Sequence, residues 1–151
     1  MTHQDQDSGE RGAVLIEFIV GVVPLLMMFF TFTQVAALAN AKLVVKHAAL
    51  AATRAAIVIL PPNPGDNGKE DDIKAAAGLA MGVYLNDGKL VAPDTQCTSQ
   101  ATTADPYGMV TCTVDVTYVC EIPMAKMWVC GGSAKGLKES MSLPNQGARY
   151  K

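Results

Sequence analysis

The chain has 151 residues, of which 50% are hydrophobic and 6% aromatic, and its formal net charge is -2. The chain has no excess of Lys and Arg over Asp and Glu, and such an excess is typical of proteins that bind nucleic-acid phosphates. Nucleic acid is therefore not expected as a partner. If about 50 of the residues belong to a long membrane-spanning helix, as argued below, the rest suffice for one small extracytoplasmic domain.

The first residues, 1–10, are polar with three acids and are expected to form a disordered tail. A run of 24 positions without a charged residue follows at 18–41. About 20 apolar residues cross a hydrocarbon core as a helix, and through Phe30 the apolar side chains occupy every side. The run therefore predicts a transmembrane helix.

The expected helix covers residues 13–60 and would be ~72 Å long at ~1.5 Å per residue. This is roughly twice what a bilayer needs, so its outer half should project from the membrane. Pro24 removes one backbone hydrogen bond inside the span, which predicts a kink or loosening there, either as a hinge or as a tolerated proline. The apolar residues that recur near helical spacing in the outer half are Leu43, Val44, Leu50 and Ile57.

A short junction, RGAVLIEF at residues 11–18, leads into the apolar run. It resembles the processing site of type IV prepilins, in which a dedicated prepilin peptidase cuts after a glycine on the cytoplasmic face. The mature chain of such proteins begins with an apolar residue and carries Glu at its fifth position. Cutting after Gly12 makes Ala13 the first residue and Glu17 the fifth. The resemblance therefore implies a leader peptide at residues 1–12.

Two further segments, PLL at 24–26 and the alanine-rich run at 48–56, resemble TadE-like minor pilins of tight-adherence systems. The resemblance covers about a third of the chain, and Gln34 stands where the family often carries a second acid. It implies a minor pilin or pseudopilin assembled through its N-terminal hydrophobic helix. Its implied partners are other pilin-like subunits, the pilus assembly machinery and the peptidase. Its implied location is the bacterial inner membrane, with the C-terminal domain periplasmic or extracellular.

Glu17 lies near the start of the apolar run. A carboxylate at the bilayer centre costs ~2.5–3.5 kcal/mol, so an acid inside a span usually has a partner or a function. In an uncleaved chain Glu17 would sit at the membrane interface at little cost. In a processed chain the resemblance implies that Glu17 pairs with the Ala13 amine of a neighbouring subunit. On this basis Glu17, Phe18 and Pro24 are assigned to assembly.

The segment after the first helix, residues 61–151, is expected to form the outer domain. A proline-rich turn at 61–65 ends the first helix, and a second helix is predicted at 69–86, with acids in its first turn. Asp66 or Asn67 could cap it. Its apolar stripe is Ile73, Ala76, Ala77, Ala80, Met81 and Tyr84. A turn is expected at 86–88.

From Leu90 onward the hydrophobic period changes to two, which indicates strands. The clearest strand is residues 110–120, with Cys112 and Cys120 on its buried face. Residues 95–107 are expected to form a loop, 124–130 and 137–143 two further strands, and 144–151 a tail. The predicted fold class is α+β: a long N-terminal helix extending into a small domain with a second helix and a short antiparallel sheet.

All four cysteines follow the span, and an even number on one side of a membrane indicates disulfides in an oxidising compartment. Zinc is the alternative, but the chain has no CxxC and neither histidine lies near them. Short loops and strand alternation favour Cys97–Cys112 and Cys120–Cys130. The other two pairings remain open from sequence alone.

The sequence lacks the motifs of common enzymes, and its only histidines are His3 and His47, so neither catalysis nor a cofactor or metal is expected. The alternative to a pilin is an uncleaved single-span protein whose disulfide-stabilised outer domain binds a partner. The distribution of Lys and Arg opposes the expected orientation, because basic residues usually lie on the cytoplasmic side and here Lys42, Lys46 and Arg54 follow the span. The cysteine distribution and the prepilin-like junction favour the expected orientation, with the C-terminal domain outside the cytoplasm.

Overall fold

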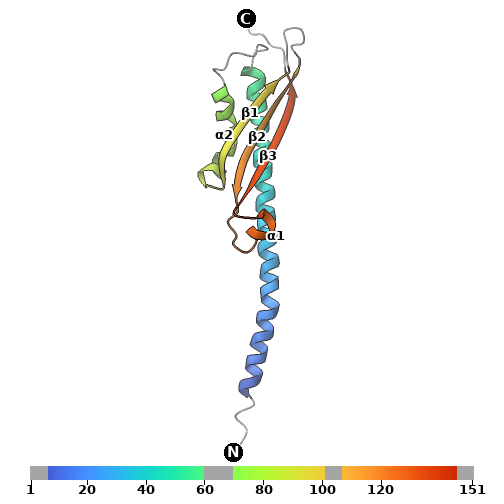
Figure 1. Ribbon diagram of the computed structural model, residues 1–151, viewed down its shortest axis with the longest axis vertical. Helices are drawn as coiled ribbons and strands as arrows, with labels where there is room; N and C mark the ends of the chain where they lie inside the picture. The colour runs from blue at the N-terminus through green and yellow to red at the C-terminus, as the bar shows by residue number, and fades with distance from the viewer. Residues whose placement is uncertain (1–6, 60–69, 101–106, 146–151) are drawn as a thin grey trace, which may run out of the picture.

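The structure is a computed structural model that describes residues 7–59, 70–100 and 107–145. These residues form helix α1 (Asp7–Ile59), helix α2 (Glu70–Asn86) and strands β1 (Leu90–Ser99), β2 (Met109–Val119) and β3 (Ala134–Pro144), with a short π-helical segment η2 (Lys126–Cys130). Figure 1 shows α1 as a long rod whose C-terminal half carries the rest of the domain, while its N-terminal half stands alone. The predicted α+β class is confirmed.

Helix α1 is one continuous helix of 53 residues that passes through Pro24 without a break. A proline interrupts only one bond of the helix, and the bonds on either side of it hold the axis. The helix begins at Asp7, earlier than the expected start at Ala13. Extending an existing helix adds one hydrogen bond per residue, so extension costs far less than nucleation. Residues 1–6 lie outside the described part of the chain.

The outer half of α1 forms one wall of the hydrophobic core. Its buried hydrophobic residues recur at helical spacing, and all but one are alanines: Ala41, Val45, Ala48, Ala49, Ala52 and Ala56. Small side chains allow the sheet and α2 to approach the helix axis closely. Leu43, expected on the apolar side, is 58% exposed, so the helix buries its alanine face instead.

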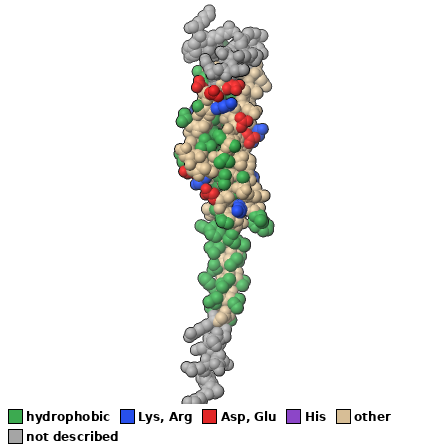
Figure 2. All heavy atoms as spheres, turned by 60° about the vertical axis from the view of Figure 1, so that its left-hand side comes forward, with side chains coloured by type: hydrophobic (Ala, Val, Ile, Leu, Met, Phe, Trp, Pro, Cys, Tyr) green, Lys and Arg blue, Asp and Glu red, His purple; other side chains and the backbone are tan. Residues whose placement is uncertain are grey.

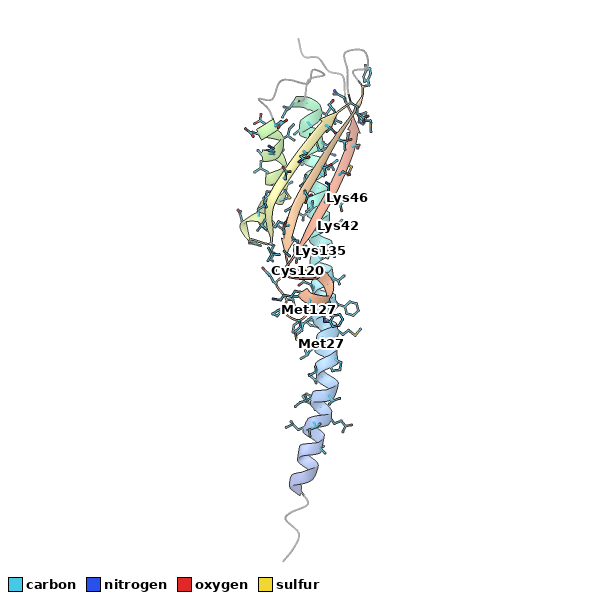
Figure 3. All side chains as sticks on the ribbon, viewed as in Figure 1. Met27, Lys42, Lys46, Cys120, Met127 and Lys135 are labelled. Carbon is cyan, nitrogen blue, oxygen red and sulfur yellow. A yellow bond between two sulfur atoms is a disulfide. The ribbon has the colours of Figure 1, made fainter. Side chains whose placement is uncertain are left out.

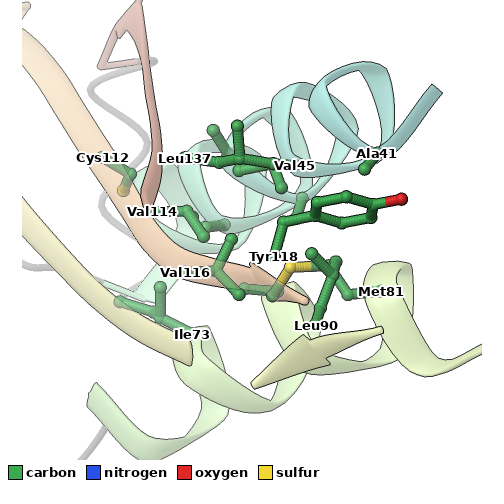
Figure 4. Close-up of a cluster of buried hydrophobic side chains, with 14 of the residues drawn as sticks. Ala41, Val45, Ile73, Met81, Leu90, Cys112, Val114, Val116, Tyr118 and Leu137 are labelled. Carbon is green, nitrogen blue, oxygen red and sulfur yellow. The ribbon is translucent and has the colours of Figure 1, made fainter. Parts of the chain in front are cut away.

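The sheet has the order β1-β2-β3, and both pairs of strands are antiparallel. The predicted strand at 110–120 is confirmed as β2, the central strand, and β3 contains the strand predicted at 137–143. Figure 4 shows that alternate residues of β2 point toward α1 and α2. These residues are Val110, Cys112, Val114, Val116 and Tyr118. The opposite face of β2 carries threonines and Asp115, so one sheet face is packed and the other is polar.

Helix α2 packs beside α1 and buries Ile73, Ala77 and Met81, which confirms most of its predicted stripe. Ala80 is exposed. The turn after α2 contains Gly88 at φ 69°, a conformation that favours glycine. The predicted caps Asp66 and Asn67, the proline-rich turn and the last six residues lie outside the described residues.

Two predicted elements in the sheet region are wrong. Residues 95–99, expected to be loop, belong to β1, where Cys97 pairs with Cys112 in register. A bulge between Val91 and Asp94 breaks the alternation that would have marked this strand. Residues 126–130, expected to be strand, form η2. The Cys120–Cys130 bond closes a ten-residue separation, so the chain must turn back rather than extend.

Candidate functional site

The N-terminal half of α1 is the most unusual surface of the molecule. Among the described residues, α1 holds the one helix segment, Gly12–Ile59, that is long and apolar enough to cross a membrane. Its most apolar window of 18 residues contains no buried residue. A water-soluble chain rarely exposes so large an apolar surface. We therefore describe this half, residues 12–33, as the stem, and the stem is a candidate membrane span.

Two threonines near the outer end of the stem bond to backbone carbonyls of the same helix. Thr31 Oγ1 donates to the Met27 carbonyl at 2.8 Å, and Thr33 Oγ1 donates to the Phe29 carbonyl at 2.9 Å. Hydrocarbon offers no partner for a free hydroxyl, so bonds within the helix lower the cost of placing threonine near lipid. The outer end of the stem is thus compatible with an apolar surrounding.

The residues assigned to processing and assembly all lie on the exposed stem. Gly12, Ala13 and Glu17 are exposed, Phe18 is 66% exposed, and Pro24 follows farther along the same helix. Ala13 and Glu17 are four residues apart and share one helix face. Within the described residues Glu17 has no ion-pair or hydrogen-bond partner. The described residues of a single copy therefore supply no counter-charge to this carboxylate.

Gln34 marks the junction between the stem and the domain. It is 1% exposed and is the first buried side chain in the described part of α1. Its Oε1 accepts a long hydrogen bond from the Ile122 amide at 3.4 Å, and its Nε2 lies 3.9 Å from Cys130 Sγ. Gln34 thereby links the helix to the segment between β2 and β3. An amide offers both a donor and an acceptor here, whereas a carboxylate would offer only acceptors.

The four cysteines form two disulfides, Cys97–Cys112 and Cys120–Cys130, which is the favoured pairing. The first joins neighbouring strands, and the second closes the connection between β2 and β3. No cysteine remains for zinc, and among the described residues no group of three or more His, Cys, Asp or Glu could hold a metal. The disulfides fit an extracytoplasmic, oxidising compartment.

Two hollows lie on the part of the domain that the structure describes. One, of about 360 Å³, is lined by α2 and β1 residues that include Glu70, Lys74 and Asp94. The other, of about 190 Å³, lies beside Gln34 and includes Tyr84 and Lys89. Neither lining contains a histidine, the side chain that most often serves as a general acid or base.

Sequence reasoning missed two buried polar residues that join elements of the fold, Gln34 and Thr53, and one exposed tryptophan. Gln34 was noted only as a departure from an acidic position. Thr53 is buried, and its hydroxyl lies 2.6 Å from the Ala49 carbonyl and 3.2 Å from the Met141 carbonyl, which joins α1 to β3. Trp128 is 85% exposed. The sequence offers one indication for Gln34 and Thr53, which is that each is a polar residue within a largely apolar helix.

No family model, no curated protein and no solved structure matches this chain.

Proposed function

We propose that this protein is a minor pilin or pseudopilin of a tight-adherence pilus or secretion system, anchored in the bacterial inner membrane and assembled through its N-terminal helix. The supporting observation is the division of α1 into two halves. The stem exposes apolar side chains on all sides, while the outer half is a wall of the domain core. A subunit of this shape can exchange contacts with lipid for contacts with neighbouring stems without unfolding its domain.

The proposed assembly step uses the junction at residues 12–17. Cleavage after Gly12 creates a positively charged amine on Ala13, and Glu17 of a neighbouring subunit supplies the opposite charge. Such a pair attracts strongly in an apolar surrounding, although desolvation offsets much of the gain. Its directionality sets the register between stems. The exposure of Glu17 and its lack of a partner among the described residues support this role.

The second candidate function is that of an uncleaved single-span protein with a partner-binding outer domain. One observation favours it: α1 is continuous from Asp7 through Gly12 and Ala13. A scissile bond inside a helix must be unwound before a peptidase can reach it. Gly12 lowers that cost, since glycine is ~1 kcal/mol less favourable than alanine in a helix.

Mass spectrometry of the membrane-derived protein tests the proposal. In cells with an active prepilin peptidase we expect a mature chain that begins at Ala13 and has 139 residues, which is 151 minus 12. Cells without the peptidase should yield only the uncut chain, which serves as the control. A bulky replacement, Gly12→Leu, should block cutting. If cells with the peptidase retain residues 1–12 on every chain, the uncleaved alternative holds and the pilin proposal is wrong.

A further inference from the structure

The connection between β2 and β3 carries an exposed apolar cluster. We call residues 121–129, closed by the Cys120–Cys130 disulfide, the cystine loop. Three of its side chains project into solvent: Trp128 is 85% exposed, Met127 75% and Met124 46%. The disulfide joins the two ends of the loop, and the hydrogen bond from the Ile122 amide to Gln34 Oε1 links the loop to α1. The loop is therefore a fixed projection and does not cover its own apolar side chains.

The cystine loop lies at the end of the domain that faces the stem. In Figure 3, Met127 lies between Cys120 and Met27 along the long axis of the molecule. Figure 2 shows charged side chains over the domain and a continuous apolar surface below, with apolar side chains projecting sideways at the boundary. The loop thus meets the level at which α1 would leave a membrane.

We infer that the cystine loop inserts into the lipid–water interface of the membrane leaflet from which α1 emerges. Tryptophan is enriched at this depth because its ring is apolar while its N–H remains able to reach water or headgroups. Methionine adapts its flexible side chain to an irregular apolar surface. Lys126 is exposed within the loop and can extend its amine toward the headgroups, whereas Lys135 Nζ donates to the Val129 carbonyl at 3.3 Å and links the loop to β3.

Insertion of the loop gives the domain a second attachment to the bilayer. A single helix alone allows the domain to rotate about the helix axis and to tilt. An inserted loop on one side of α1 restricts both motions and presents the same domain face to neighbouring copies. The inference depends on α1 crossing a membrane and does not depend on cleavage or filament assembly.

The chain offers a direct reporter, because Trp128 is its only tryptophan. We would reconstitute the full chain in phosphatidylcholine vesicles at low protein density and measure Trp128 fluorescence. The expected result is emission at shorter wavelength than in the denatured chain and severalfold weaker quenching by acrylamide. Lipids brominated near the headgroup end of the acyl chain should quench more strongly than lipids brominated near its terminus. Emission and acrylamide quenching like those of the denatured chain would overturn the inference.

A matched control moves the reporter onto α2, which lies farther from the stem than the cystine loop does (Figure 1). Leu79 on α2 is 84% exposed, close to the value for Trp128. The variant Trp128→Phe with Leu79→Trp should show strong acrylamide quenching and no quenching by brominated lipid. Measurements at several ratios of protein to lipid distinguish shielding of Trp128 by lipid from shielding by a second copy of the chain. If shielding of Trp128 disappears on dilution with lipid, a neighbouring subunit covers the loop and the lipid inference is wrong.

Discussion

At the scale of single residues, Glu17 and Gln34 are two polar side chains of one helix that differ in burial and in hydrogen bonding. Gln34 is buried and contacts both ends of the closed cystine loop, at Ile122 and at Cys130. Glu17 is exposed and has no partner among the described residues. The first residue stabilises the subunit itself. The second is available to another molecule, which is why we assign it to assembly.

The change Glu17→Gln separates an assembly role from an interfacial one. If Glu17 pairs with the Ala13 amine of a neighbour, the variant leaves that amine unpaired, and breaking a buried pair from one side costs ~3–5 kcal/mol. We expect incorporation into sheared surface fractions to be lost while the amount in membranes and the cleavage stay unchanged. Immunoblotting of both fractions measures this outcome.

The control for that comparison is Glu70→Gln, an equally conservative change at an exposed site on α2. It should leave incorporation intact. Equal incorporation of the Glu17→Gln variant and the wild type would reject the pairing mechanism, even for a protein that proves to be a pilin.

At the scale of elements, the contact between α1 and the sheet depends on small side chains. Ala48 is 0% exposed within the core cluster, and Ala39 lies on the exposed side of the same helix. Leucine and alanine have similar helix propensities, so a substitution at either position tests packing more than helix formation. The salt bridge between Lys42 and Glu139, at 3.3 Å, joins the same two elements but is partly exposed and adds little.

We expect Ala48→Leu to lower the free energy of unfolding by about 1–3 kcal/mol, because overpacking forces the sheet away from the helix. Ala39→Leu should be close to neutral. Urea unfolding in detergent micelles, followed by circular dichroism, measures both. An unchanged midpoint for Ala48→Leu would mean that the interface between α1 and the sheet is looser than the structure describes.

At the scale of the whole molecule, the stem and the domain are separable in their packing. Every buried residue of the described chain lies at Gln34 or beyond it. The stem contributes apolar surface but no core side chain. The two parts therefore differ in surface: the domain exposes charged and polar side chains, and the stem exposes the apolar side chains of a candidate membrane span.

A chain that begins at Thr33 should consequently be soluble without detergent and should keep its fold. Its melting temperature should lie within a few degrees of that of the domain in the full chain, since no core contact is lost. Threonine is also an acceptable first residue for a helix. Ultracentrifugation and thermal circular dichroism after oxidative refolding provide the measurement. Aggregation or a non-cooperative transition would show that the stem supports the domain after all.

The amino-acid sequence by itself determined the features that depend on local period and length. A long uncharged run predicts a span, a period of 3.6 predicts α2, and alternation predicts β2. The spacing of four cysteines on neighbouring turns and strands favoured the pairing that the structure contains. Each of these signals lies within one segment of the chain, so no knowledge of distant residues is required to detect it.

Only the tertiary structure decided which apolar residues are inside. Leu43 and Ala48 are both apolar, and the close approach of the sheet selects the smaller one for the core. The extension of β1 past its bulge depends on pairing with β2, and the turn at η2 depends on a disulfide between residues ten apart. The burial of Gln34 and the placement of the cystine loop against α1 likewise come from contacts between segments distant in sequence. Such contacts have no local period, because they depend on the distance and shape of the partner element.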